Sequence, residues 1–181
     1  MDEQHLDPLE FQVIREMASS LYFNLHMDQW LSAVPGLTER LARGIHVLDV
    51  GCGAGASTVT MASTFPRSRF LGVEPDAVSV AQARRRAAEH RLDNVYWVTG
   101  RVDELAPQPT HDLICAFDGV HDTDDPRSAL RAIHAALADD GVYLWSEPVT
   151  GVRELAKEAG FSRVEKLPVA NPFNQLFALR K

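Results

Sequence analysis

The sequence is poor in the features that mark secreted, membrane and metal-binding proteins. It has only two cysteines in 181 residues, Cys52 and Cys115, and no Cys/His spacing typical of a zinc site. No apolar run approaches the length that spans a bilayer, and the acidic N-terminus does not resemble a signal peptide. We therefore expect a cytoplasmic protein with two reduced, buried thiols, no bound metal and no membrane contact.

Basic residues are scarce as well. Eighteen Lys and Arg stand against 25 Asp and Glu, which gives a net charge of −7. A protein that binds nucleic acid through its phosphates needs a basic face, so we expect no nucleic-acid partner. The only basic cluster, residues 84–86, falls within an expected helix and is interpreted as its solvated face. The hydrophobic content of 45% is ordinary for a globular chain with one substantial core.

Apolar strands and amphipathic helices alternate from residue 45 onward. Strands are expected at residues 45–50, 69–73, 94–99, 112–117 and 142–146, followed by a hairpin of strands at 163–167 and 176–179. Helices are expected at 56–65, 76–90 and 152–159, and in a segment striped by Leu130, Ile133 and Leu137 that ends before a turn at 139–141. This alternation predicts an α/β fold with a Rossmann-like, doubly wound sheet of seven strands, mostly parallel with an antiparallel C-terminal hairpin.

Residues 1–44 differ from the rest and are expected to add helices to a domain at residues 45–181. One side of a helix carries four residues spaced i, i+3, i+4 and i+7, namely Phe23, His26, Met27 and Trp30. Two compatible interpretations stay open. The helix packs against the sheet, or it also forms a lid with Tyr22, His26 and Trp30 facing a substrate.

The most informative segment, residues 47–55, reads Val-Leu-Asp-Val-Gly-Cys-Gly-Ala-Gly. An apolar strand runs into a glycine-rich turn that opens a helix, and glycines there let a ligand pass close to the backbone. Nineteen residues after Gly55, Glu74 ends the next apolar run. A carboxylate at that place accepts hydrogen bonds from a ribose diol. The two features together predict a pocket for an adenosine-containing cofactor.

Asp49 bears on which cofactor this is. Residues 51–56 loosely fit the dinucleotide fingerprint. Asp49, however, lies two residues before the first glycine, where a carboxylate repels a pyrophosphate but suits a ligand that carries an ammonium and a sulfonium group. The chain is also too short for a full dinucleotide fold plus a catalytic domain. These points favour S-adenosylmethionine (SAM) over NAD.

Residues 47–55 resemble motif I of class I SAM-dependent methyltransferases. Five later segments resemble further motifs of that family in the right order, at residues 70–75, 99–105, 116–126, 138–142 and 158–161. Residues 117–126 and 171–174 are more closely similar to the catalytic domain of bacterial methyltransferases that carry an N-terminal winged-helix domain, which this sequence does not contain.

The resemblance implies roles for individual residues. The residues implied to contact the cofactor are Asp49, Gly51, Gly53, Glu74, Pro75, Val102, Asp103, Phe117 and Asp118. Among them, Glu74 takes the ribose hydroxyls and Asp49 lies near the amino group of the methionine tail. His121 is the candidate catalytic base, because the pKa of histidine suits proton removal from an acceptor. A structural histidine that caps the following loop is the alternative.

The sequence departs from the family pattern at two places. Many relatives have Asp where this chain has Arg101, and arginine does not accept a hydrogen bond from the adenine amino group. Asp103 or Glu104 would substitute, or adenine is held by backbone and apolar contacts. The long segment that covers the substrate in relatives is reduced here to a turn at residues 148–151. We therefore expect an open substrate side, unless residues 1–44 or a second subunit of a homodimer cover it.

The function expected from these features is methyl transfer from SAM to a small organic acceptor. The alternative is a module that binds SAM or S-adenosylhomocysteine without turnover of its own, as a partner-dependent subunit or a reduced scaffold. His121 favours the enzyme, and the short turn at residues 148–151 favours the alternative. No Asn-Pro-Pro-Tyr or Asp-Pro-Pro-Tyr follows the fourth strand, which argues against methylation of DNA bases or glutamine.

Overall fold

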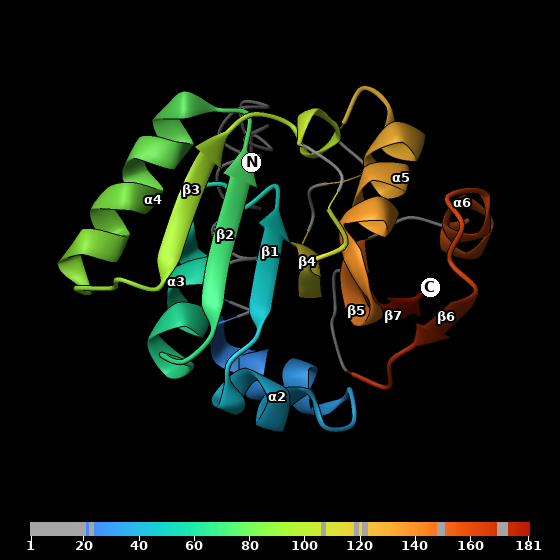
Figure 1. Ribbon diagram of the computed structural model, residues 1–181, viewed down its shortest axis with the longest axis horizontal. Helices are drawn as coiled ribbons and strands as arrows, with labels where there is room; N and C mark the ends of the chain where they lie inside the picture. Colours follow the sequence, from blue (N-terminus) through green and yellow to red (C-terminus); the bar gives the residue numbers. More distant parts are fainter. Residues whose placement is uncertain are drawn as a thin grey trace, which may run out of the picture.

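The computed structural model describes residue 21 and residues 24–105, 108–117, 120, 123–147, 151–169 and 174–181 (Figure 1). Residues 24–32 are helical. The elements that follow are α2 (Leu37–Arg43), β1 (His46–Val50), α3 (Ala56–Thr64), β2 (Arg69–Glu74), α4 (Ala77–Glu89), β3 (Val95–Thr99), the 3-10 turn η1 (Val102–Glu104), β4 (His111–Phe117), α5 (Pro126–Ala136), β5 (Leu137–Glu147), α6 (Val152–Glu158), β6 (Arg163–Lys166) and β7 (Gln175–Arg180). None of the helices in these ranges is long and apolar enough to cross a bilayer.

The seven strands form one sheet in the order β3-β2-β1-β4-β5-β7-β6. β1 to β5 run parallel, whereas β7 runs antiparallel to both β5 and β6. This confirms the predicted mixed sheet and its C-terminal hairpin. The chain order reverses between β1 and β4, which lie side by side in the centre of the sheet. In open α/β sheets, ligands bind beyond the carboxyl ends of the strands at such a switch point.

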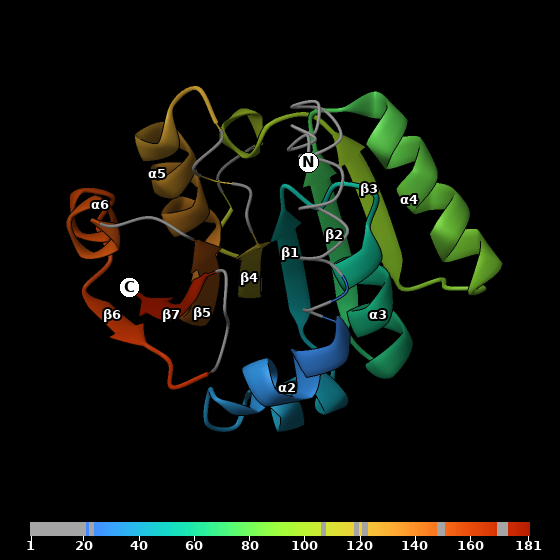
Figure 2. The same cartoon turned by 180° about the vertical axis from the view of Figure 1, so that it is seen from behind.

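Alternate strand residues point to opposite faces of the sheet and build two cores. Leu48 and Ile114 pack with α5 and α6 on the face toward the viewer in Figure 1. Val47 and Leu113 pack with α2, α3 and the helix at residues 24–32 on the face seen in Figure 2. Because both faces of these central strands are buried, their sequences are nearly continuous apolar runs rather than alternating ones.

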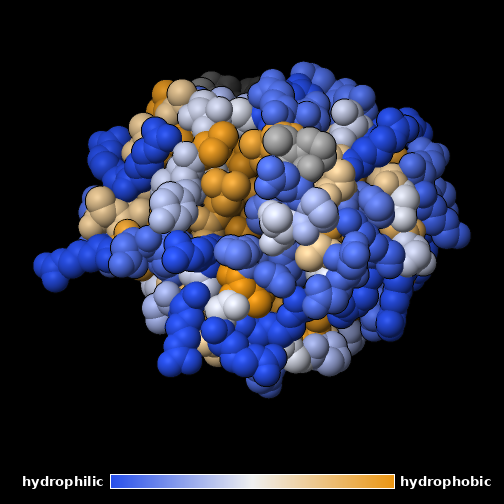
Figure 3. Space-filling view, viewed as in Figure 1, coloured by the Kyte–Doolittle hydropathy of each residue, from blue (hydrophilic) through white to orange (hydrophobic). Residues whose placement is uncertain are grey.

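One part of the sheet carries no covering helix. Within the described residues, the connection from β3 to β4 contains only the short turn η1, so α5 and α6 cover β1, β4 and β5 while no helix covers β2 and β3 on the side seen in Figure 1. A shallow groove of about 290 Å³ lies there, lined in part by His46, Leu71 and Tyr96. Tyr96 is 55% exposed. Figure 3 shows an apolar patch on this side of the molecule.

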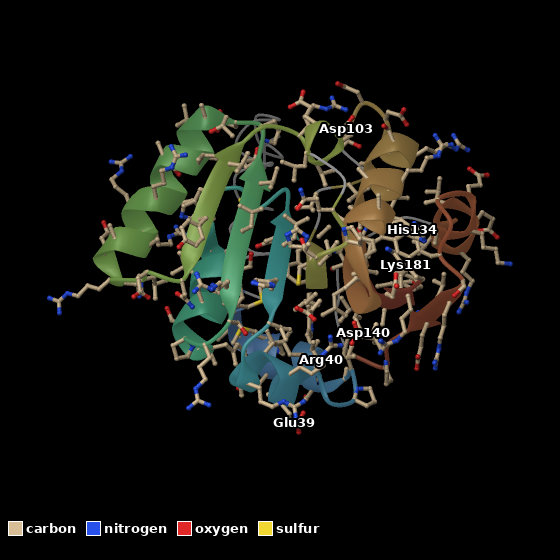
Figure 4. The ribbon with its side chains drawn as sticks, viewed as in Figure 1. Glu39, Arg40, Asp103, His134, Asp140 and Lys181 are labelled. Atoms are coloured by element: carbon tan, nitrogen blue, oxygen red, sulfur yellow. The ribbon has the colours of Figure 1, made fainter. Side chains whose placement is uncertain are left out.

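The amino edge of the sheet is fastened by Arg40 of α2 (Figure 4). Its guanidinium lies 3.2 Å from the carboxylate of Asp112 in β4 and donates a 3.1 Å hydrogen bond to the carbonyl of Asp140 in β5. Asp112 also accepts a 2.9 Å hydrogen bond from the backbone N–H of His46 at the start of β1. These contacts join the N-terminal helical segment to the starts of three strands.

The start of β5 differs from the prediction. Leu137 was expected to continue the preceding helix, but its backbone is extended and it pairs with His111 at the start of β4. The next pair is Leu113 with Val142, so residues 138–141 form a bulge inside the strand rather than a turn before it. At Gly141 a Cβ would lie 2.7 Å from the Leu137 side chain and 3.0 Å from the His111 carbonyl, so the bulge requires glycine.

Candidate functional site

The predicted site residues that the structure describes gather at the carboxyl edge of the sheet. Gly51 and Gly53 follow β1, Glu74 ends β2, and Phe117 ends β4. Figure 4 shows Asp103 of η1 at this edge, on the opposite side of the molecule from Arg40. The structure therefore brings the loops after four neighbouring strands together. Three predicted residues, Tyr22, Asp118 and His121, lie outside the described residues.

The glycine loop is a backbone cradle that side chains would obstruct. Gly51, Gly53 and Gly55 all have positive φ, at 68°, 51° and 74°, a region that favours glycine. A Cβ on Gly53 would meet no atom within 4 Å, so this glycine faces open space. The loop is anchored on the next strand, because the N–H of Gly51 donates a 2.9 Å hydrogen bond to the carbonyl of Val73. Gly53 thus leaves room for a ligand to lie on the backbone.

Glu74 joins this loop to the start of α4. Its Oε2 accepts a 3.0 Å hydrogen bond from the N–H of Gly53, and its Oε1 accepts one of 3.0 Å from the N–H of Asp76. A carboxylate offers about four acceptor positions. The half-buried Glu74 side chain therefore has capacity to accept hydrogen bonds from a diol as well. Pro75, which follows it, is exposed.

Asp49 is a buried acid directly beneath the glycine loop. Its side chain is 2% exposed, and its Oδ2 accepts hydrogen bonds from Thr58 Oγ1 at 2.6 Å and Ser57 Oγ at 3.0 Å. Burial raises the pKa of Asp49 to about 6 even though both hydroxyls lower it, and the charge of Glu74 raises it further. The carboxylate is therefore mostly ionised at pH 7 and suits a cationic group.

The sequence did not lead us to Ser57 and Thr58 as the partners of Asp49. Both residues lie in the first turn of α3, which begins at Ala56 directly after the glycine loop. The sequence did contain a usable signal. The glycine loop reverses the chain, so the first turn of α3 lies next to the end of β1. Two hydroxyl residues at that place can serve a carboxylate at the end of β1. They stabilise a charge that burial alone would disfavour.

Arg101 occupies the turn after β3 and engages the acids around it. Its guanidinium forms two hydrogen bonds with Asp103, at 3.0 and 3.1 Å, and a third of 3.1 Å with Asp124. The hydrogen bonds from Arg101 lower the pKa of Asp103. Glu104, the other predicted substitute for an adenine contact, accepts a 3.0 Å hydrogen bond from the backbone N–H of Arg101. Both carboxylates are thus already engaged. Val102, between Arg101 and Asp103, is buried.

Trp30 links the N-terminal helix to the end of β4. Its ring meets that of Phe117 edge to face at a centroid distance of 5.6 Å, and Trp30 is 3% exposed. Met27 and Leu31 of the same helix are also buried in the core on this face. His26 is half-buried. These contacts show the packing role of the helix, and the lid role of His26 and Trp30 stays a prediction.

With the fold and this geometry established, comparison with known proteins identifies the family. The model of the methyltransferase domain family matches residues 48–143, which is more than half of the chain and spans β1 to β5. The chain belongs to this methyltransferase domain family.

A sequence relative agrees with this assignment, and two solved structures share the fold. A trans-aconitate 2-methyltransferase of Paracidovorax citrulli is 34% identical over 110 residues, covering 60% of this chain and 40% of the relative. The structure of mitomycin 7-O-methyltransferase aligns with a TM-score of 0.73 at 19% identity, over 98% of this chain and 59% of that one. A phosphoethanolamine N-methyltransferase of Haemonchus contortus, solved with S-adenosylhomocysteine, aligns with a TM-score of 0.63 at 20% identity, over 74% of this chain and 37% of that one.

The matched part of the chain spans about two fifths of the first of these relatives and somewhat more than half of the second. The family supports S-adenosylmethionine as the cofactor, as the sequence predicted. In the described part of the chain, no three His, Cys, Asp or Glu side chains gather into a possible metal site.

Proposed function

We propose that this chain binds SAM at the carboxyl edge of its sheet and transfers the methyl group to a small organic acceptor. The observation that carries the proposal is the contact between Glu74 and the glycine loop beside the buried acid Asp49. The family supports the reaction type, and relatives such as a trans-aconitate 2-methyltransferase support a small acceptor.

Each proposed contact follows from the local chemistry. Gly53 leaves its side open, so an extended methionine tail could lie along the loop. Glu74 is held at the end of β2, where its carboxylate would accept hydrogen bonds from the two ribose hydroxyls. Asp49 supplies negative charge below the loop, near the place proposed for the ammonium group. The remaining cofactor contacts that we propose are those of Gly51, Pro75, Val102, Asp103, Phe117 and Asp118.

SAM supplies a methyl group that is already activated by the sulfonium. The work left to the protein is to hold donor and acceptor in line and to remove a proton from the acceptor. Phe117 and Trp30 form an apolar wall at the end of β4, which would exclude water from that side of the reacting groups. We propose His121 as the base, with Tyr22 and His26 on the acceptor side.

The charge of the chain supports this choice of acceptor. A net charge of −7 disfavours nucleic acid, whose phosphates require a basic surface. We further propose a cytoplasmic site of action, in keeping with two cysteines that are both free and buried.

Calorimetry with the purified chain tests the cofactor assignment. SAM and S-adenosylhomocysteine should bind and NADH should not. Binding of NADH without binding of SAM would overturn the assignment. Incubation with methyl-labelled SAM and a panel of small carboxylic acids, phenols and amines then tests turnover. Label transfer to one class supports the enzyme and names its acceptor. If SAM binds but no class of acceptor receives the label, in an assay whose positive controls work, the result favours a binding module that needs a partner.

A further inference from the structure

We infer that Trp97 of β3 is a positioning residue that sets the position of the glycine loop and thereby the affinity for the cofactor. The inference rests on the proposed function, since SAM is the ligand whose binding it concerns. Trp97 is not part of the glycine motif, and it lies more than forty residues further along the chain. Its connection with the loop is visible only in the folded protein.

The six-membered ring of Trp97 occupies the space in front of two glycines. A Cβ on Gly55 would lie 2.5 Å from Cη2 and 2.9 Å from Cζ3 of Trp97. A Cβ on Gly72 would lie 2.5 Å from both Cε3 and Cζ3 of the same ring. Real Cβ atoms do not approach other atoms so closely. The indole therefore packs directly on bare backbone of the loop and of β2. Trp97 is the nearest neighbour of both glycines, although a Cβ on Gly55 would also meet Ala83 and a Cβ on Gly72 would also lie 2.9 Å from Cys52 Sγ.

Two residues of α4 lie beside Trp97. Ala83 of α4 adjoins the same space, because its Cβ would lie 2.8 Å from a Cβ on Gly55. The backbone carbonyl of Trp97 accepts a 3.2 Å hydrogen bond from the guanidinium of Arg84, also in α4. The half-buried ring thus lies at the junction of the loop, β2 and α4. A rigid aromatic ring at this place can keep the loop backbone at a defined distance from the strands.

The loop position matters because the candidate cofactor contacts lie on either side of Gly55. Gly53, two residues before it, donates to Glu74. Gly55 itself precedes α3, whose first turn supplies the hydroxyl of Thr58 to Asp49. A shift of Gly55 toward a space left by a smaller side chain would displace both contacts. Binding sites require their groups within about 0.5 Å of the productive geometry, and packing behind the first contacts provides this precision.

Two variants on the same strand separate positioning from general packing. Trp97→Leu removes the ring, and Tyr96→Leu changes the neighbouring aromatic residue, which is 55% exposed on the opposite face. Binding of S-adenosylhomocysteine is measured by calorimetry under conditions in which urea unfolding shows each variant to be folded. We expect Kd to rise about tenfold for Trp97→Leu, a change typical of a lost supporting contact, and less than twofold for Tyr96→Leu. A folded Trp97→Leu variant with unchanged Kd would overturn the inference.

If Trp97→Leu is too unstable to measure, Trp97→Phe takes its place. A second experiment combines either variant with a change at Gly72. Gly72 does not have positive φ, so Gly72→Ala tests steric space alone. In the native background it should push the ring against the loop and weaken binding of S-adenosylhomocysteine. In the Trp97→Phe or Trp97→Leu background, the same change should cost less, because the contact with the ring is relieved and only the 2.9 Å approach to Cys52 Sγ remains. Additive effects in these double variants would contradict the inference.

If the unaltered chain fails to bind S-adenosylhomocysteine, the proposed function fails and the ligand role of Trp97 fails with it. Non-additive unfolding of the variants would then show that Trp97 acts in packing alone.

Discussion

The backbone N–H of Gly53 donates a 3.0 Å hydrogen bond to Oε2 of Glu74 and so joins the glycine loop to the end of the neighbouring strand. The second carboxylate oxygen accepts a hydrogen bond from Asp76, the residue that caps α4. One side chain therefore fixes two backbone segments at the carboxyl edge. Glu74 has a structural role in shaping the site in addition to the ligand contact proposed for it.

Replacement of Glu74 should weaken SAM binding. We expect Glu74→Ala to cost roughly 1.5–3 kcal/mol of binding free energy, the range for hydrogen bonds to a charged group. The fold should survive, because the residue lies at the end of a strand. Glu39→Ala is the matched control, since Glu39 is an exposed acid on α2 near the opposite edge (Figure 4). Calorimetry that shows the same Kd for Glu74→Ala and the native chain would remove Glu74 from the site.

Loss of the Thr58 hydroxyl should destabilise the fold. Thr58→Val keeps the shape of the side chain but removes the 2.6 Å hydrogen bond to the buried carboxylate of Asp49. The free energy of unfolding should fall by about 1.5–3 kcal/mol, because a buried charge loses a partner. Thr60→Val serves as the control, since the Thr60 hydroxyl bonds only the carbonyl of Ala56 in its own helix. Urea unfolding of the two variants gives the comparison, and equal losses would contradict the prediction.

The raised pKa of Asp49 should appear in the pH dependence of stability. The folded protein binds the Asp49 proton more tightly than the unfolded chain does, with a pKa of about 6 against 3.8. Its contribution to stability is therefore fully present below pH 3.8, decreases as the pH rises toward 6, and is lost above that. Asp49→Asn should remove this decrease, a difference of roughly 1–3 kcal/mol between pH 4 and pH 7. Urea unfolding across that interval measures it. Parallel pH profiles for the two proteins would argue against a raised pKa.

The N-terminal helix should respond to ligand if it covers the donor end of the site. Trp30 already reaches Phe117 at the end of β4, so a cofactor bound there would bring further contacts to the helix. Hydrogen exchange of residues 24–32 should then slow when SAM is added. Exchange of α6, which lies over the β5 side of the sheet, provides an internal reference. Identical protection of residues 24–32 with and without SAM would leave this helix with a packing role only.

Local patterns predicted most of the fold correctly. A helix was expected at residues 76–90, and it is capped by Asp76, whose carboxylate accepts hydrogen bonds from the N–H groups of Val78 and Ser79. The alternation of strands and helices was enough for the mixed sheet and its hairpin, because each signal lies within a few residues. Leu137 shows the limit of such patterns. It continues the apolar stripe of α5, yet pairing with His111 draws it into β5. Contacts made far along the chain override a local period.

The sequence predicted those site residues that belong to one short motif. It did not predict contacts between residues that are far apart in the chain. Residues 47–55 and Glu74 pointed to the proposed cofactor site, and the structure places Glu74 in contact with the glycine loop. The contact of Arg101 with Asp124, 23 residues away, has no signal in the sequence. The same holds for the packing of Trp97 on Gly55 and Gly72. Such pairs depend on how loops and strands are placed in three dimensions.

The side of β2 and β3 without a covering helix has a practical consequence for work with this protein in solution. Tyr96 and the half-buried Leu71 present an apolar strip to water, flanked by His46 and Arg69. Hydrophobic dyes and column matrices should therefore adsorb there, at a distance from the glycine loop. A charged residue in place of Tyr96 should keep the chain dispersed at higher concentration while leaving the proposed cofactor site at the carboxyl edge unchanged.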